Sequence, residues 1–267
     1  MYYLPLYLQF IKIRLQSMIE YRATFLTGAV AQFVSYGSTF LLVWVMVNQF
    51  GTLSGWNPYE VMFLYSLNLG SYAITGYFLF NLCFRLPTLI QTGEFDEVLT
   101  KPLNPLLYIV CRDFNYGYFS HLILSIVIMT ICFIKLGIVV TFLKLILLVV
   151  VILAAALIQG AALLFTSVPS FWLVRGNSLM KTFFFDVKDF IQYPISLYNK
   201  TIQIMLTFVF PYAFISFYPA QYFLEKNDFL MFHPIFQYLT PIVGVVMFVL
   251  AYGFWNLGIN NYKSTGS

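Results

Sequence analysis

The chain has 267 residues and a mass of 30.9 kDa; 61% of its residues are hydrophobic and only 9% are charged. An average soluble domain carries about 25% charged residues, so the 14 Lys and Arg and 10 Asp and Glu are too few to cover a soluble surface of this size. The composition therefore excludes a soluble domain, a disordered chain and a coiled coil, and it favours a membrane protein. The net charge of +4 is spread along the chain and gives no basic surface of the kind that binds nucleic acid.

Cysteine and histidine residues form no ligand pattern. Cys83, Cys111 and Cys132 have no CxxC spacing, and His121 and His233 are far apart in the sequence. A structural zinc site needs four such ligands at regular spacings. We therefore expect no metal, and no cofactor bound by this chain, and we interpret these side chains as packing residues.

Six apolar stretches approach or exceed the roughly 20 residues that a bilayer-crossing helix needs. The longest unbroken run, from Leu145 to Leu157, lacks the polar–apolar alternation of barrel strands. The sequence thus predicts one all-α membrane domain over residues 1–267 with six transmembrane helices. The predicted spans are 23–47, 61–83, 116–134, 145–168, 201–218 and 235–257.

Basic residues are distributed unequally among the predicted loops. Eleven of the 14 Lys and Arg residues, Arg175 and Lys188 among them, lie in the two ends of the chain and in the stretches 84–114 and 169–200. The other loops hold only Lys135, Lys144 and Lys226. Because Lys and Arg are enriched in cytoplasmic loops, we expect both termini and both stretches to be cytosolic. No Asp, Glu, Lys or Arg lies inside a predicted span, so coupling to protons or sodium has no evident site.

Two further segments are expected to meet the membrane without crossing it. Gln9, Lys12, Gln16 and Glu20 recur at helical spacing, so residues 4–21 are predicted to form an amphipathic helix in the inner headgroup layer. An early start to the first span is the alternative interpretation. The outer segment Pro219–Pro234 is apolar for a loop and is predicted to re-enter the membrane.

Three segments carry a family resemblance: Leu89–Pro105, Tyr193–Tyr198 and Phe210–Ala220. With the six-span layout, they resemble the permease subunits of bacterial type-2 ATP-binding-cassette (ABC) exporters, in the branch where a lone permease is encoded beside a separate ATPase. The chain has no GxxxxGK[ST] motif, so it cannot hydrolyse ATP by that route. The resemblance implies ATP and Mg²⁺ on cytosolic ABC ATPase subunits and a location in the bacterial plasma membrane. It also implies an N-terminal elbow helix and a homodimer, or a heterodimer with a sister permease.

The resemblance also implies a short cytosolic coupling helix that docks into each ATPase. It maps onto Gly93 through Leu99 and is closed by Pro102. Phe95 and Leu99 lie four residues apart and would share one face, while Glu94, Asp96 and Glu97 would stay in water. We expect this apolar pair to enter a groove of the ATPase. A short interfacial helix without a partner is the alternative, and catalysis by the acids is disfavoured because no His or metal set accompanies them.

In that family the translocation path runs mainly along the second and fifth spans. Two stripes are the candidates for its lining: Asn68, Ser71, Tyr72 and Thr75 on the second span, and Gln203, Thr207, Phe210 and Phe214 on the fifth. Polar stripes in apolar helices also hold helices together, so lining and packing both remain open.

The expected function is export of an apolar or amphipathic substrate by alternating access. A lipid-modifying membrane enzyme and a membrane scaffold without a transport cycle are the alternatives.

Overall fold

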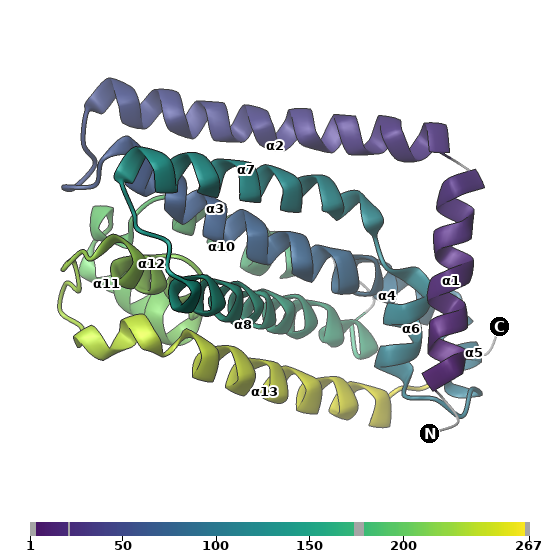
Figure 1. Cartoon of the computed structure of the whole chain (residues 1–267). Helices are drawn as coiled ribbons and strands as arrows, with labels where there is room; N and C mark the ends of the chain where they lie inside the picture. Colours follow the sequence, from purple (N-terminus) through teal and green to yellow (C-terminus); the bar gives the residue numbers. More distant parts are fainter. Residues whose placement is uncertain (1–3, 21, 174–178, 265–267) are drawn as a thin grey trace.

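The computed structural model describes residues 4–20, 22–173 and 179–264, so Tyr21 and Arg175 lie outside the described residues. The described chain is built almost entirely of helices, which confirms the predicted all-α class. Its long helices lie side by side, and α1 (Leu4–Glu20) runs across one end of them (Figure 1). On α1, the predicted polar face and apolar residues such as Leu8 and Ile13 are both exposed.

Four helices in the described part of the chain are long and apolar enough to cross a membrane. They coincide with the second, third, fourth and sixth predicted spans and confirm them as candidate spans. The first of the four is continuous through α3 (Pro58–Thr75), a π-helical turn (Gly76–Phe80) and α4 (Asn81–Gln91). The other three contain α7 (Phe119–Leu136), α8 (Phe142–Ser167) and α13 (Thr240–Asn260).

The first predicted span lies within α2 (Arg22–Phe50), which packs along α7 and α3. The apolar helix Leu26–Leu42 within it is shorter than the four candidates above. A membrane crossing by α2 therefore stays a prediction.

The predicted fifth span is not one straight helix. The helical segments Lys200–Val209 and Tyr212–Leu224, which include α11 (Lys200–Ile204) and α12 (Phe217–Leu224), are bent by 78° relative to each other. The break lies at Pro211, whose ring disfavours helical geometry in the residue before it, and Phe210 accordingly has φ −117° and ψ 90°. The predicted fifth span over residues 201–218 is therefore bent, and a membrane crossing by it stays a prediction.

Residues 180–192 form a run of short helical turns around α10 (Val187–Asp189), which lies beside α3 (Figure 1). The ammonium nitrogen of Lys188 is 3.5 Å from the centroid of the Tyr72 ring. Tyr72 lies fourteen residues beyond Pro58 in a continuous 34-residue helix, or roughly 21 Å from one end of a rod about 50 Å long. Wherever a hydrocarbon layer about 30 Å thick lies along that rod, it contains Tyr72.

The sequence did not predict the position of Lys188. No charged residue lies inside the six predicted spans as drawn, but Lys188, from the stretch 169–200, packs beside the second of these spans. The positive charge of Lys188 placed it with the loops, whereas in the folded chain its side chain is buried against aromatic rings.

Close approach of α8 and α13 depends on glycine. A Cβ on Gly244 would overlap the backbone carbonyl oxygen of Ala154, and one on Gly258 would meet the Phe171 ring at 2.5 Å and Val168 at 3.0 Å. Small residues at such positions let two membrane helices pack backbone to backbone. These contacts make α8 and α13 one closely packed pair.

Candidate functional site

The predicted coupling segment folds as the short helix α5 (Glu94–Leu99). Gly93 precedes it with φ +73°, a conformation that favours glycine, so the chain turns sharply out of α4. Phe95 is fully buried. Its ring contacts Phe171 beyond α8, Trp255 on α13 and Tyr262 beyond α13, at centroid distances of 5.2, 6.3 and 5.1 Å.

Phe95 therefore does not project toward a partner, and its predicted pairing with Leu99 on a docking face is wrong. Helical spacing placed both residues on one side of α5. In the structure, Phe95 on that side is buried in the protein, whereas Leu99 is exposed. The adjacent buried residue Val98 completes the inward face, which sequence reasoning missed. Burial and, after it, the neighbouring Asp96 carboxylate raise the pKa of Tyr262 to about 12, so this hydroxyl is neutral at physiological pH.

The outward face of α5 is small and acidic. Glu94, Glu97 and Leu99 are exposed, and Pro102 is exposed just beyond the helix. Asp96 is half-buried and accepts a hydrogen bond of 2.6 Å from Ser264 near the end of the described chain. This face can offer carboxylates and one apolar side chain to a partner.

The polar stripe of α3 divides into packing contacts and cavity lining. Ser71 and Thr75 bind α8: Gln159 donates to the Ser71 hydroxyl at 2.7 Å, and Thr75 donates to the Ala156 carbonyl at 2.7 Å. Asn68 also accepts from Gln159, through its carboxamide oxygen at 3.2 Å. For Ser71 and Thr75, the interpretation as helix-packing residues is the one the contacts support.

Asn68 and Tyr72 also line a cavity of about 310 Å³ between α2, α3 and the 185–192 segment. Ser35 and Tyr36 of α2 form one wall, and Lys188, Asp189 and Gln192 form another. The Tyr36 hydroxyl donates to that of Tyr72 at 3.4 Å, and the Tyr72 and Tyr118 hydroxyls lie 3.2 Å apart. His121 packs against the rings of Tyr36 and Tyr118 beside this cluster.

The candidates from the fifth predicted span lie elsewhere. Thr207 donates to the Gln203 carbonyl at 2.7 Å and lies 2.9 Å from the Tyr218 hydroxyl, within the bent pair itself. Phe214 is buried against Tyr218 and Phe236, and Phe210 lines a separate apolar cavity. None of these four residues lines the cavity that holds Asn68 and Tyr72, so the structure does not bring the two stripes into one site.

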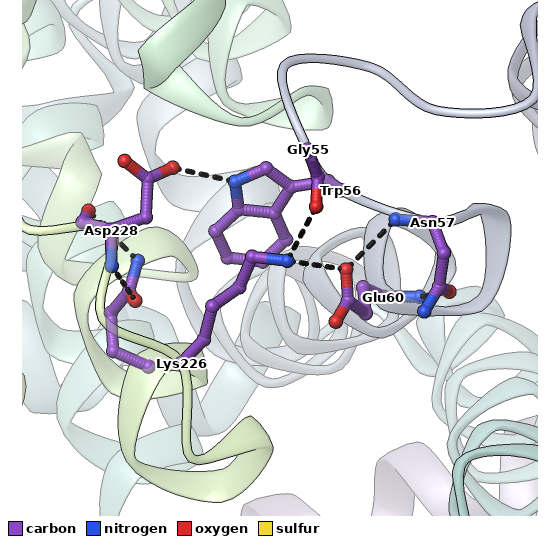
Figure 2. A network of polar contacts seen from close by, with 7 residues as sticks. Gly55, Trp56, Asn57, Glu60, Lys226 and Asp228 are labelled. Atoms are coloured by element: carbon purple, nitrogen blue, oxygen red, sulfur yellow. Dashed lines mark hydrogen bonds and ion pairs between the residues drawn. The ribbon is translucent and has the colours of Figure 1, made fainter.

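A polar network at the end opposite α5 joins the loop after α2 to the segment after α12 (Figure 2). The buried Trp56 indole donates to the Asp228 carboxylate at 2.7 Å. Lys226 donates to the Gly55 carbonyl and to the Glu60 carboxylate, both at 2.7 Å, with its ammonium 4.6 Å from the Trp56 ring centroid. Sequence analysis missed this network because Lys226 and Glu60 are 166 residues apart in the chain.

Among the described residues, no group of three or more His, Cys, Asp or Glu side chains is arranged to hold a metal ion. All three cysteines are free thiols.

These features define a multi-pass helical membrane protein. The family described as ABC-2 family transporter protein matches residues 33–266, and the chain belongs to that family. It is a membrane permease subunit, a type of transport subunit that has no ATPase domain of its own. No curated protein and no solved structure matches the chain.

Proposed function

We propose that this chain is the permease subunit of an ATP-driven exporter that moves an apolar or amphipathic substrate by alternating access. Separate cytosolic ATPase subunits hold ATP and Mg²⁺ and dock at the α5 end of the molecule. The permease works in the plasma membrane of a bacterium, as a homodimer or beside a sister permease. Both chain ends are then cytosolic, α1 is the elbow helix, residues 201–218 belong to a broken fifth span, and Pro219–Pro234 is the outer re-entrant element.

One observation carries the coupling part of this proposal: the buried anchor at Phe95. The Phe95 ring packs against Phe171, just beyond α8, and against Trp255 on α13. Because this contact is closely packed, a displacement of α5 is transmitted directly to the α8–α13 pair. The exposed Glu94, Glu97 and Leu99 are the side chains available to the ATPase. Phe95 transmits the movement, and its neighbours make the contact.

The test is purification of the tagged chain from its native membrane, followed by measurement of ATP hydrolysis by the subunits that accompany it. We expect an ATPase to co-purify, and Glu97→Lys combined with Leu99→Asp to reduce its recovery at least tenfold. Glu20→Lys, an exposed acid on α1, is the matched control and leaves recovery unchanged.

The proposal would be overturned if no ATPase accompanied the wild-type chain and if the Glu97→Lys, Leu99→Asp variant still exported substrate from cells at the wild-type rate. That result would favour a lipid-modifying enzyme or a membrane scaffold. Substrate-stimulated ATP hydrolysis in reconstituted vesicles would exclude both of these alternatives.

A further inference from the structure

The cavity between α2, α3 and the 185–192 segment is lined by a cation, Lys188, that forms no ion pair within the described chain. Lys188 is 7% exposed, and it lies at the depth of Tyr72 in the long α3–α4 helix. Among the described residues, no carboxylate oxygen comes within 4.0 Å of its ammonium nitrogen. Within the described chain, the Lys188 ammonium nitrogen instead lies over aromatic rings, 3.5 Å from the Tyr72 centroid and 5.3 Å from the Phe184 centroid.

A buried ammonium group in this position is only partly stabilised. Cation–π contacts of this kind offset some of the lost hydration, but removing a charge from water costs more than such contacts return unless an anion is present. Ionisable residues at membrane depth are rare, and where they occur they usually pair with one another or mark a substrate or ion pathway. Lys188 has no such partner within the described chain, so we look for one in the cavity that it lines.

The remaining walls suit an acidic group joined to an apolar body. Asn68 uses its carboxamide oxygen for Gln159, and no described residue accepts a hydrogen bond from its NH₂ group, which leaves that donor for a ligand. Leu69 and Phe185 supply apolar lining. The volume of about 310 Å³ equals that of roughly ten water molecules, enough for a phosphate or carboxylate and the first part of a chain.

The carboxylate of Asp189 also lines this cavity, but it does not neutralise Lys188 by direct contact. It accepts a hydrogen bond of 2.7 Å from Gln192, and its side chain is exposed. Ser35, on the opposite wall, is exposed as well, so the cavity is reached from outside the chain between these two residues. The cation therefore lies inside and the acid at the rim.

We propose that this cavity binds the acidic headgroup of an amphipathic substrate, with Lys188 as the counter-ion and Asn68 as a neutral donor. The proposal rests on the proposed export function and adds the chemical class of the cargo. Tyr72 takes part by holding the ammonium over its ring. The sequence-based expectation of an amphipathic substrate thereby becomes specific about charge.

The test is equilibrium binding of radiolabelled dodecyl phosphate to the full-length chain in phosphatidylcholine nanodiscs, together with the shift in melting temperature that it produces. We expect Lys188→Gln to weaken binding roughly 10- to 100-fold, the loss expected for a charge-assisted contact. Lys188→Arg should retain most of the affinity. Lys181→Gln removes an exposed lysine from the preceding helical turn and serves as the matched control with wild-type binding.

Several outcomes separate this proposal from others. Without ligand, Lys188→Gln should melt at or above the wild-type temperature, because it removes an uncompensated buried charge, and it should lose the ligand-induced shift. Asp189→Asn should bind dodecyl phosphate at least as well as wild type. Equal binding by Lys188→Gln and wild type, or equal binding of dodecyltrimethylammonium, would overturn the proposal, as would full competition by the same concentration of inorganic phosphate. Binding is measured on this chain, so it can fail while an ATPase still co-purifies, and the reverse also holds.

Discussion

Replacing Phe95 with alanine should detach α5 from the body of the protein while leaving the membrane helices folded. The Phe95 ring is fully buried and meets three other rings at 5.1 to 6.3 Å. Truncating a buried Phe to Ala typically costs about 3–5 kcal/mol. Helix α5 has only six residues, and isolated helices of that length do not persist in water. The cost should therefore appear as local opening of α5.

Hydrogen exchange followed by mass spectrometry measures that opening directly. A loss of about 3–5 kcal/mol raises the open population by roughly two to four orders of magnitude. The backbone amides of Asp96 and Thr100, which donate to the carbonyls of Gly93 and Asp96 in the native fold, should exchange faster by that factor. Leu99→Ala is the control on the same helix; its side chain is 38% exposed, and it should change exchange less than tenfold.

Transport and ATPase recovery should also distinguish Phe95→Ala from Leu99→Ala. Phe95→Ala should abolish transport while ATPase recovery falls only in part, because α5 can still close when the ATPase docks but no longer carries a ring into the α8–α13 pair. Leu99→Ala should weaken ATPase recovery while α5 stays folded. Exchange at Asp96 and Thr100 within threefold of wild type in Phe95→Ala would refute the argument that this ring anchors α5.

Two further predictions concern packing at other positions. Gly244→Ala should destabilise the α8–α13 contact by about 1–3 kcal/mol, because its methyl group would overlap the Ala154 carbonyl; Gly253→Ala, with nothing within 4 Å of the added atom, should leave the melting temperature unchanged or slightly raised. Lys226→Met should destabilise the network around Trp56 and Glu60 by about 1–3 kcal/mol, because the Gly55 carbonyl loses its ammonium donor and the largely buried Glu60 carboxylate keeps only the Asn57 N–H. Lys144→Met removes an ion pair whose acid is 79% exposed and should cost less than about 1 kcal/mol, so equal losses in the two lysine variants would contradict this reasoning.

Hydropathy was sufficient for the spans whose apolar stretch is also a straight helix. The predicted stretches 61–83, 116–134, 145–168 and 235–257 each lie in or overlap a candidate span in the structure. Hydropathy was not sufficient at 201–218, because a bent pair and a straight crossing have the same composition. Pro211 was the local signal of the break. Whether the chain bends there depends on how the helical segments on either side of Pro211 pack in the folded protein.

Around α5, spacing predicted the helix but not which way it faces. The Gly93 turn and the short helix after it followed from local sequence. Whether Phe95 points out or in depended on Phe171 and Trp255, which come from segments more than 70 residues farther along the chain. No pattern within 89–105 carries that information.

The sequence by itself determined that this chain is a membrane protein. It also determined which residues form the long helices, and that a short turn and helix follow the second span. These properties depend on composition and on neighbours along the chain, since a lipid environment requires each crossing segment to satisfy its own backbone. Only the tertiary structure decided where Lys188 lies. Its charge assigned it to a loop, but contact with Tyr72, more than 100 residues earlier, holds it at membrane depth beside a cavity. The cost of burying a charge depends on what surrounds it in space, and the aromatic faces and cavity walls around Lys188 come together only in the folded chain.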